Sequence, residues 1–158
     1  MRISLALSVV LVLNMPGAPA GEKPKSAVSA DEKRIFELTN QERKKKDAAP
    51  LALSPLLCKL ARAHSENMAR QMRMEHTLDN KSPFDRMRDA GYKFANAGEN
   101  IGTGSDNAPV TLVMQAWMES EGHRANILNT QFTEIGVGIA RDKAGVIYYT
   151  QVFGRPQK

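Results

Sequence analysis

The chain has 158 residues, which suits one domain and is too short for an enzyme with a separate cofactor domain. Hydrophobic residues make up 42% and charged residues 25%, a composition typical of globular rather than disordered proteins. The formal net charge is +5, but 22 basic residues are mixed with 17 acidic ones, so we expect a solvated surface and no nucleic-acid partner. The single cysteine, Cys58, excludes an intramolecular disulfide framework and any cysteine-cluster metal site.

The first 20 residues have the pattern of a secretory signal peptide. Arg2 supplies a positive start, residues 3–15 are mostly apolar, and residues 18–20 (Ala-Pro-Ala) form a small-residue cleavage pattern. Cleavage there would remove Arg2 and leave residues 21–158 with a net charge of +4. No later stretch approaches the roughly 18 apolar residues of a spanning helix. We therefore expect a secreted protein, extracellular or periplasmic, without a transmembrane segment.

Residues 21–29 are rich in Lys, Pro and Ser and are predicted to be a linker ahead of one domain, residues 30–158. Capping signals, such as Ser29 with Glu32, and apolar residues at helical spacing predict four helices. The expected helices cover residues 30–46, 55–72, 83–90 and 107–119. The inward stripe of the second consists of Leu57, Leu60, Ala61, His64, Met68 and Met72. His64 is expected to be a buried, hydrogen-bonded histidine, and Cys58, next to this stripe, is expected to be a packing residue.

The hydrophobic period changes near the C-terminus. Residues 135–139 alternate between large apolar and small side chains, and residues 146–153 are rich in β-branched and aromatic ones. Turn-forming residues 142–145 lie between them, which predicts an antiparallel hairpin. A third strand is expected within residues 92–101, because a lone pair of strands is marginally stable. Helices followed by a small antiparallel sheet predict an α+β fold.

Three residues at expected junctions between elements could carry chemistry: His76, Glu99 and His123. Two neutral imidazoles and a carboxylate could bind a divalent ion such as zinc and leave a position open for water. Their spacing matches no fixed metal motif, so two ordinary hydrogen-bonded histidines are the alternative. The HExxH, GxSxG and P-loop motifs are all absent from the sequence.

Several sequence blocks occur in an order that belongs to a known family. The blocks are residues 35–43, 61–69, Gly98-Glu99-Asn100-Ile101, Trp117-Met118-Glu119-Ser120, 122–129 and 132–138. Together they resemble the CAP superfamily, the SCP-like extracellular domains named after cysteine-rich secretory proteins, antigen 5 and pathogenesis-related 1. The similarity is to the short bacterial branch and covers about residues 35–154.

This resemblance implies an α-β-α sandwich with a three-stranded antiparallel sheet between helical layers. It also implies a central cavity lined by two histidines and two acidic residues. His76, Glu99 and His123 match three of these positions, whereas the fourth is Ser120, where many eukaryotic members carry an acid. A complete four-residue set is therefore not expected. The cysteines of animal and plant members are missing as well.

The resemblance suggests three functions, of which we rank a binding module first. Its cavity would hold zinc or another divalent metal on His76 and His123, together with an unknown extracellular or envelope ligand, lipid-like as in some eukaryotic members. A structural or interaction domain of the cell envelope ranks second. A metal-dependent, protease-like hydrolase ranks third, with Glu99 as general base. We expect a binding protein rather than an enzyme.

Overall fold

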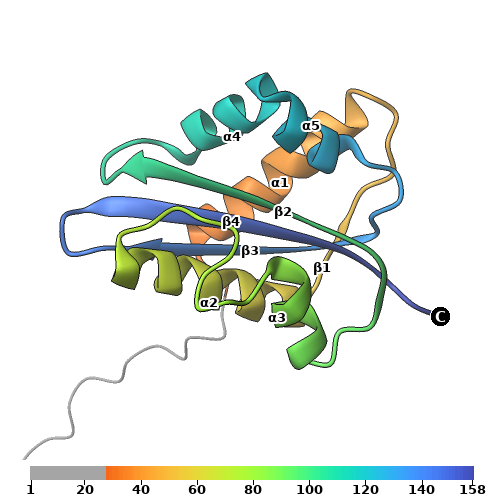
Figure 1. The fold of residues 1–158 in the computed structure, drawn as a ribbon. Helices are drawn as coiled ribbons and strands as arrows, with labels where there is room; N and C mark the ends of the chain where they lie inside the picture. The colour runs from red at the N-terminus through yellow and green to blue at the C-terminus, as the bar shows by residue number, and fades with distance from the viewer. Residues whose placement is uncertain (1–27) are drawn as a thin grey trace, which may run out of the picture.

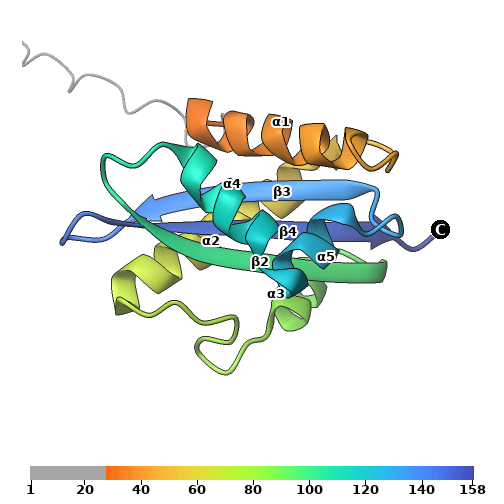
Figure 2. The same cartoon turned by 90° about the horizontal axis from the view of Figure 1, so that it is seen from above.

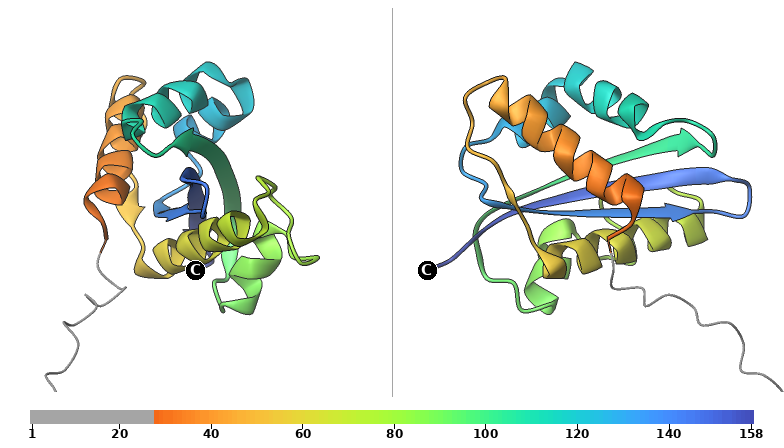
Figure 3. Two further views of the ribbon diagram at one scale, coloured as in Figure 1. Left: turned by 90° about the vertical axis from the view of Figure 1, so that its left-hand side faces the viewer. Right: turned by 180° about the vertical axis from the view of Figure 1, so that it is seen from behind.

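The computed structural model describes residues 28–158, so the predicted signal peptide and the linker up to residue 27 lie outside the described residues. Within the described range, helices pack on both faces of a single sheet (Figure 1). The helices are α1 (Ala30–Lys44), α2 (Pro55–Gln71), α3 (Pro83–Asp89), α4 (Val110–Glu119) and α5 (Glu121–Leu128). Helices α1, α4 and α5 cover one face, while α2 and α3 cover the other (Figure 2, Figure 3). The predicted α-β-α sandwich is thus confirmed.

The sheet has four strands in the described range, one more than the sequence predicted. They are β1 (Ala52–Leu53), β2 (Phe94–Ser105), β3 (Glu134–Arg141) and β4 (Val146–Pro156), in the spatial order β1-β3-β4-β2. The predicted hairpin is β3 with β4, and β2 pairs antiparallel with β4 along its length. The extra strand, β1, pairs parallel with β3 through only two residues, too short to leave a periodic signal in the sequence.

Local capping signals set the start of α1 and link it to α2. The backbone N–H of Ser29 donates to Glu32 (2.8 Å) and that of Glu32 donates to the Ser29 hydroxyl (3.2 Å), which is the predicted capping box. Glu32 also accepts two hydrogen bonds of 2.7 Å from Arg62 on α2. Helix α2 ends at Gln71, and the φ of 52° at its C-cap residue Met72 turns the Met72 side chain away from the stripe. The prediction that Met72 points inward is therefore wrong: it is 68% exposed.

The segment around His123 is a helix rather than a junction. The predicted fourth helix begins at Val110, after Pro109, and α5 follows it almost directly. Helix α5 was not predicted because only Ile127 among its eight residues is buried, so the helix carries no apolar stripe. His123 consequently lies in the first turn of α5.

The two faces of the sheet are packed in different ways. On the side of α1, α4 and α5 lies a core of large apolar side chains that includes Ile35, Trp117 and Phe153. On the other side α2 lies directly on the backbone of β3: a Cβ on Gly136 would stand 2.0 Å from the Leu57 carbonyl carbon. Among residues 28–158, no helix is long and apolar enough to cross a membrane.

Candidate functional site

Two consecutive residues of the edge strand β2, Glu99 and Asn100, organise the candidate site. Side chains alternate across a strand, so the two point to opposite faces of the sheet. Glu99 contacts groups from the side of α2 and α3, whereas Asn100 contacts α5 and the neighbouring strand. Both are buried, and the Glu99 side chain is only 2% exposed. Glu99 is hydrogen-bonded to the ring of His76, and Asn100 is hydrogen-bonded to the backbone carbonyl of His123.

The carboxylate of Glu99 lies between a histidine and an arginine. Its Oε1 is 2.9 Å from His76 Nδ1, and its Oε2 accepts a 2.6 Å hydrogen bond from Arg86 Nη2. The other terminal nitrogen of Arg86, Nη1, donates to the carbonyls of His76 and Lys81, each at 2.9 Å. Arg86 therefore ties the segment between α2 and α3, which carries His76, to β2.

The hydrogen bond to Glu99 determines which nitrogen of His76 is available. A carboxylate only accepts hydrogen bonds, so the Nδ1 of a neutral His76 ring carries the proton and Nε2 carries the free lone pair. A histidine that binds a metal typically donates its other N–H to a carboxylate in this way. The His76 side chain is half exposed, so it is also accessible.

Asn100 positions the second histidine through its backbone. The Asn100 side-chain amide donates to the carbonyl of His123 and to Gln151 Oε1, both at 3.1 Å. Asn126, also on α5, donates to Asn100 Oδ1 at 2.9 Å. The chain of bonds ends at Thr39 on α1, which accepts from Gln151 at 2.8 Å. This buried network, which we call the Asn100 network, holds α5 against the sheet.

Two histidines have buried ring nitrogens without a hydrogen-bond partner among the described residues. One is His123, through Nδ1, and the other is His64, through both nitrogens. Burial lowers the pKa of His123, and the nearby His76 lowers it further. Burial also lowers the pKa of His64, against the opposing effect of Glu99. The Nε2 of His64 is 3.8 Å from Glu99 Oε1, too far for a hydrogen bond. His64 is buried as predicted.

The other predicted site residue, Ser120, lies at the junction of α4 and α5, where its side chain makes no capping hydrogen bond. Among residues 28–158, no group of three or more His, Cys, Asp or Glu side chains is arranged to hold a metal ion. Two residues, His76 and His123, are left as candidate ligands, with Glu99 as the partner of His76. Arg86 was not predicted as a site residue, because nothing near it in the sequence indicates that its partner is the strand residue Glu99.

The helix–sheet–helix layers and the position of His76 beside a buried Glu99 match what the resemblance to the SCP-like extracellular domains implies. Comparisons with known proteins lead to the same family. Residues 36–153 match the CAP profile, described as the cysteine-rich secretory protein family. The Bacillus subtilis protein YkwD is 44% identical over 131 residues, which span 82% of this chain and 49% of YkwD.

Two solved structures extend the comparison. An extracellular SCP-domain protein from Bacillus anthracis is 33% identical, with a TM-score of 0.72, over 79% of this chain and 40% of its own. An outer surface protein from Borrelia burgdorferi shares the fold, with a TM-score of 0.76, 21% identity and coverage of 83% and 96%. The chain belongs to the cysteine-rich secretory protein (CAP) family. It spans half or less of the length of its two Bacillus relatives.

Proposed function

We propose that this CAP domain is an exported binding module in which His76 and His123 together hold a divalent metal ion, with zinc as the favoured ion. Zinc accepts imidazole nitrogens, and its remaining positions would take water or an extracellular ligand. Export is supported by the signal-peptide pattern of residues 1–20 and by the secretory family. The B. anthracis relative is likewise described as extracellular.

One observation carries the metal proposal: the buried Nδ1 of His123 has no hydrogen-bond partner among the described residues. A buried polar atom in that state costs about 1–3 kcal/mol, which a bound ion or ligand would remove. The neighbouring His76 supports the same assignment, since its Nδ1 is already bonded to Glu99 and its Nε2 is free to ligate. Two nitrogens make a site of modest affinity in which other ligands complete the coordination.

The geometry favours binding over the hydrolase alternative. A general base for a metal-bound water needs a free carboxylate oxygen within hydrogen-bond reach of that water. In Glu99, Oε1 faces His76 and Oε2 faces the charged guanidinium of Arg86. This arrangement suits a carboxylate that orients a histidine.

Zinc titration by isothermal calorimetry tests this proposal on the tag-free chain from residue 21 onward. The wild type is expected to bind one zinc ion, and the double variant His76→Ala, His123→Ala to lose about tenfold or more in affinity. The variant His64→Gln is the matched control, because it removes the remaining histidine but no proposed ligand. Equal affinities of wild type and double variant would exclude this site and favour a structural or interaction domain.

A further inference from the structure

A small polar pocket lies at the end of the sheet where β3 turns into β4, next to the starts of α1 and α4 (Figure 1). Its volume is about 230 Å³. Five parts of the chain line it: Asp31 from α1, Asp106 from the segment after β2, Val110 from α4, Arg141 from β3 and Tyr149 from β4. No residue of the candidate site lines this pocket, so its chemistry is separate from that of the two histidines.

The buried polar group of this pocket is Tyr149, which is only 3% exposed. Its hydroxyl has no hydrogen-bond partner among the described residues. The other two tyrosines differ, since Tyr92 donates to Glu134 (2.8 Å) and Tyr148 donates to Asp142 (3.3 Å). Because a buried tyrosine hydroxyl usually finds a partner, the unpaired hydroxyl indicates a place that a ligand can occupy.

The Tyr149 hydroxyl is held in place without being sealed inside the core. The Tyr149 ring packs with the apolar core on the side of α1 and α4. It also lies against Gly104 of β2, where a Cβ would stand 3.2 Å from the ring. The described side-chain atoms that are both fully enclosed and unpaired belong to Arg43, His64 and His123, and the Tyr149 hydroxyl is not among them. The hydroxyl therefore has access to the pocket that its residue lines.

The charged groups of the pocket leave one negative charge unbalanced. The Asp31 carboxylate has no hydrogen-bond or ion-pair partner among residues 28–158. Asp106 forms an ion pair with Arg141, so this guanidinium is already occupied. Burial raises the pKa of Tyr149, and Asp31 raises this pKa further against the opposing effect of Arg141. The phenol therefore stays protonated at neutral pH, and its oxygen can still accept a hydrogen bond.

We propose that this pocket binds the ammonium group of an organic amine, which donates to the Tyr149 hydroxyl and to the Asp31 carboxylate. An ammonium carries three N–H donors and a positive charge, so it satisfies both groups at once. Ile139 and Ile147 line the same pocket and offer apolar contacts to the carbon chain of the amine. An anion is not favoured, because Asp31 repels it and Arg141 is occupied. The amine is either a free small molecule or the side chain of a lysine.

NMR titration of the ¹⁵N-labelled chain from residue 21 onward tests this inference, with n-butylammonium as the probe. We expect a dissociation constant on the order of millimolar and shifts of the backbone amides around the pocket. The neutral alcohol n-butanol has the same carbon chain and is expected to bind about tenfold more weakly, and butyrate is expected not to bind. Equal binding of n-butanol and n-butylammonium would overturn the inference. Nα-acetyl-lysine methylamide separates the two sources: tighter binding than n-butylammonium assigns the pocket to a lysine side chain, and weaker binding assigns it to a free amine.

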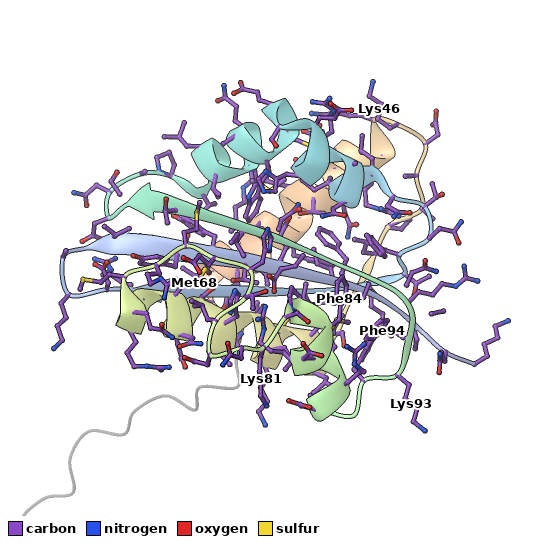
Figure 4. All side chains as sticks on the ribbon, viewed as in Figure 1. Lys46, Met68, Lys81, Phe84, Lys93 and Phe94 are labelled. Atoms are coloured by element: carbon purple, nitrogen blue, oxygen red, sulfur yellow. The ribbon has the colours of Figure 1, made fainter. Side chains whose placement is uncertain are left out.

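Two variants locate the binding, and the neighbouring tyrosine is the matched control. Tyr149→Phe removes only the hydroxyl and Asp31→Asn removes only the charge, and each is expected to weaken n-butylammonium binding about fivefold or more. Tyr148→Phe is expected to leave binding unchanged, because Tyr148 packs on the opposite face of the sheet with Met68 of α2, which Figure 4 labels. Unchanged binding by both Tyr149→Phe and Asp31→Asn would overturn the inference.

Thermal unfolding without ligand is an independent measurement of the unpaired hydroxyl. Tyr148→Phe loses its hydrogen bond to Asp142 and is expected to unfold at a lower temperature than the wild type. Tyr149→Phe loses no hydrogen bond within the described residues and is expected to unfold at the wild-type temperature or above it. A decrease as large as that of Tyr148→Phe would show that the Tyr149 hydroxyl is already paired, which would contradict the inference.

Discussion

Buried polar side chains differ in their hydrogen bonding between the two faces of strand β2. In the Asn100 network, the side chains of Asn100, Asn126, Gln151 and Thr39 bond to one another and to backbone carbonyls. On the opposite face, Glu99 is surrounded by His76, Arg86 and the buried His64. The ring nitrogens of His64 have no hydrogen-bond partner within normal distance among the described residues. Fully bonded networks rigidify a core, and partly bonded ones mark places where a ligand is expected. The Asn100 network therefore serves as scaffold, and the candidate site lies at this edge of the sheet, between His76 beside Glu99 and His123 on α5.

The packing of helices against the sheet also differs between its two faces. On the Asn100 face, bulky side chains such as Trp117 and Phe153 fill the space between helices and sheet. On the Glu99 face, α2 approaches the backbone of β3 at Gly136 and Gly138. Close backbone contact leaves little freedom for α2, and this fixes the start of the segment that leads to His76. The candidate site is thus held by one of the tightest contacts in the described structure.

The largest loss of stability is expected from adding a methyl group at Gly136, where α2 lies closest to the backbone of β3. In Gly136→Ala, the new Cβ would lie within 2.3 Å of three backbone atoms of Leu57 and Cys58, so α2 must move away from the sheet. We expect a loss of more than about 3 kcal/mol in the free energy of unfolding, measured with urea. The matched control is Gly122→Ala in α5, where no atom lies within 4 Å. It is expected to stabilise by about 0.5–1 kcal/mol. A small cost at Gly136 would show that the contact can relax.

The next largest effect is expected from removal of the Asn100 side-chain amide, which is at the centre of the Asn100 network. Asn100→Leu leaves the buried Gln151, the partly buried Asn126 and the His123 carbonyl without the hydrogen bonds that they make to Asn100. We expect a loss of about 2–3 kcal/mol in the free energy of unfolding. The control is Gln115→Leu, an exposed amide on α4 that bonds only to Glu119 and should change stability by less than about 0.5 kcal/mol. Equal effects of the two substitutions would mean that the Asn100 network adds no special stability.

The smallest effect is a pH dependence that arises from His64 on α2 and His123 on α5. The pKa values of His64 and His123 are lowered by burial, below the unfolded value of about 6.5. As the pH falls through 6.5, the unfolded chain binds protons that the folded chain does not, so the free energy of unfolding decreases. The decrease is up to about 1.4 kcal/mol per pH unit for each histidine until its folded pKa is reached. In urea unfolding between pH 7.5 and 5.0, His64→Gln is expected to show a shallower slope. An unchanged slope would mean that His64 is protonated equally in both states.

Local signals predicted most of the fold. The capping residues Ser29 and Ser82, with partners three residues later, mark helix starts that the structure confirms. The hairpin of β3 and β4 followed from alternation and a turn. The short strand β1 and helix α5 were missed because neither has enough buried apolar residues to produce a period. His76, Glu99 and His123 were candidates because they lie at expected junctions between elements, and the family resemblance then matched them to its cavity positions, since their spacing matches no motif.

The sequence by itself determined the class of fold, the family and the pair of histidines, because capping, periodicity and the ordered motif blocks are encoded within short stretches of chain. Only the tertiary structure decided what surrounds these residues. It placed Arg86 against Glu99, left the His64 nitrogens without partners among the described residues and put Glu99 and Asn100 on opposite faces of an edge strand. The physical reason is that an ion pair between a helix and a strand depends on how the elements pack. That packing is set by contacts across the whole domain, including the close approach of α2 to Gly136.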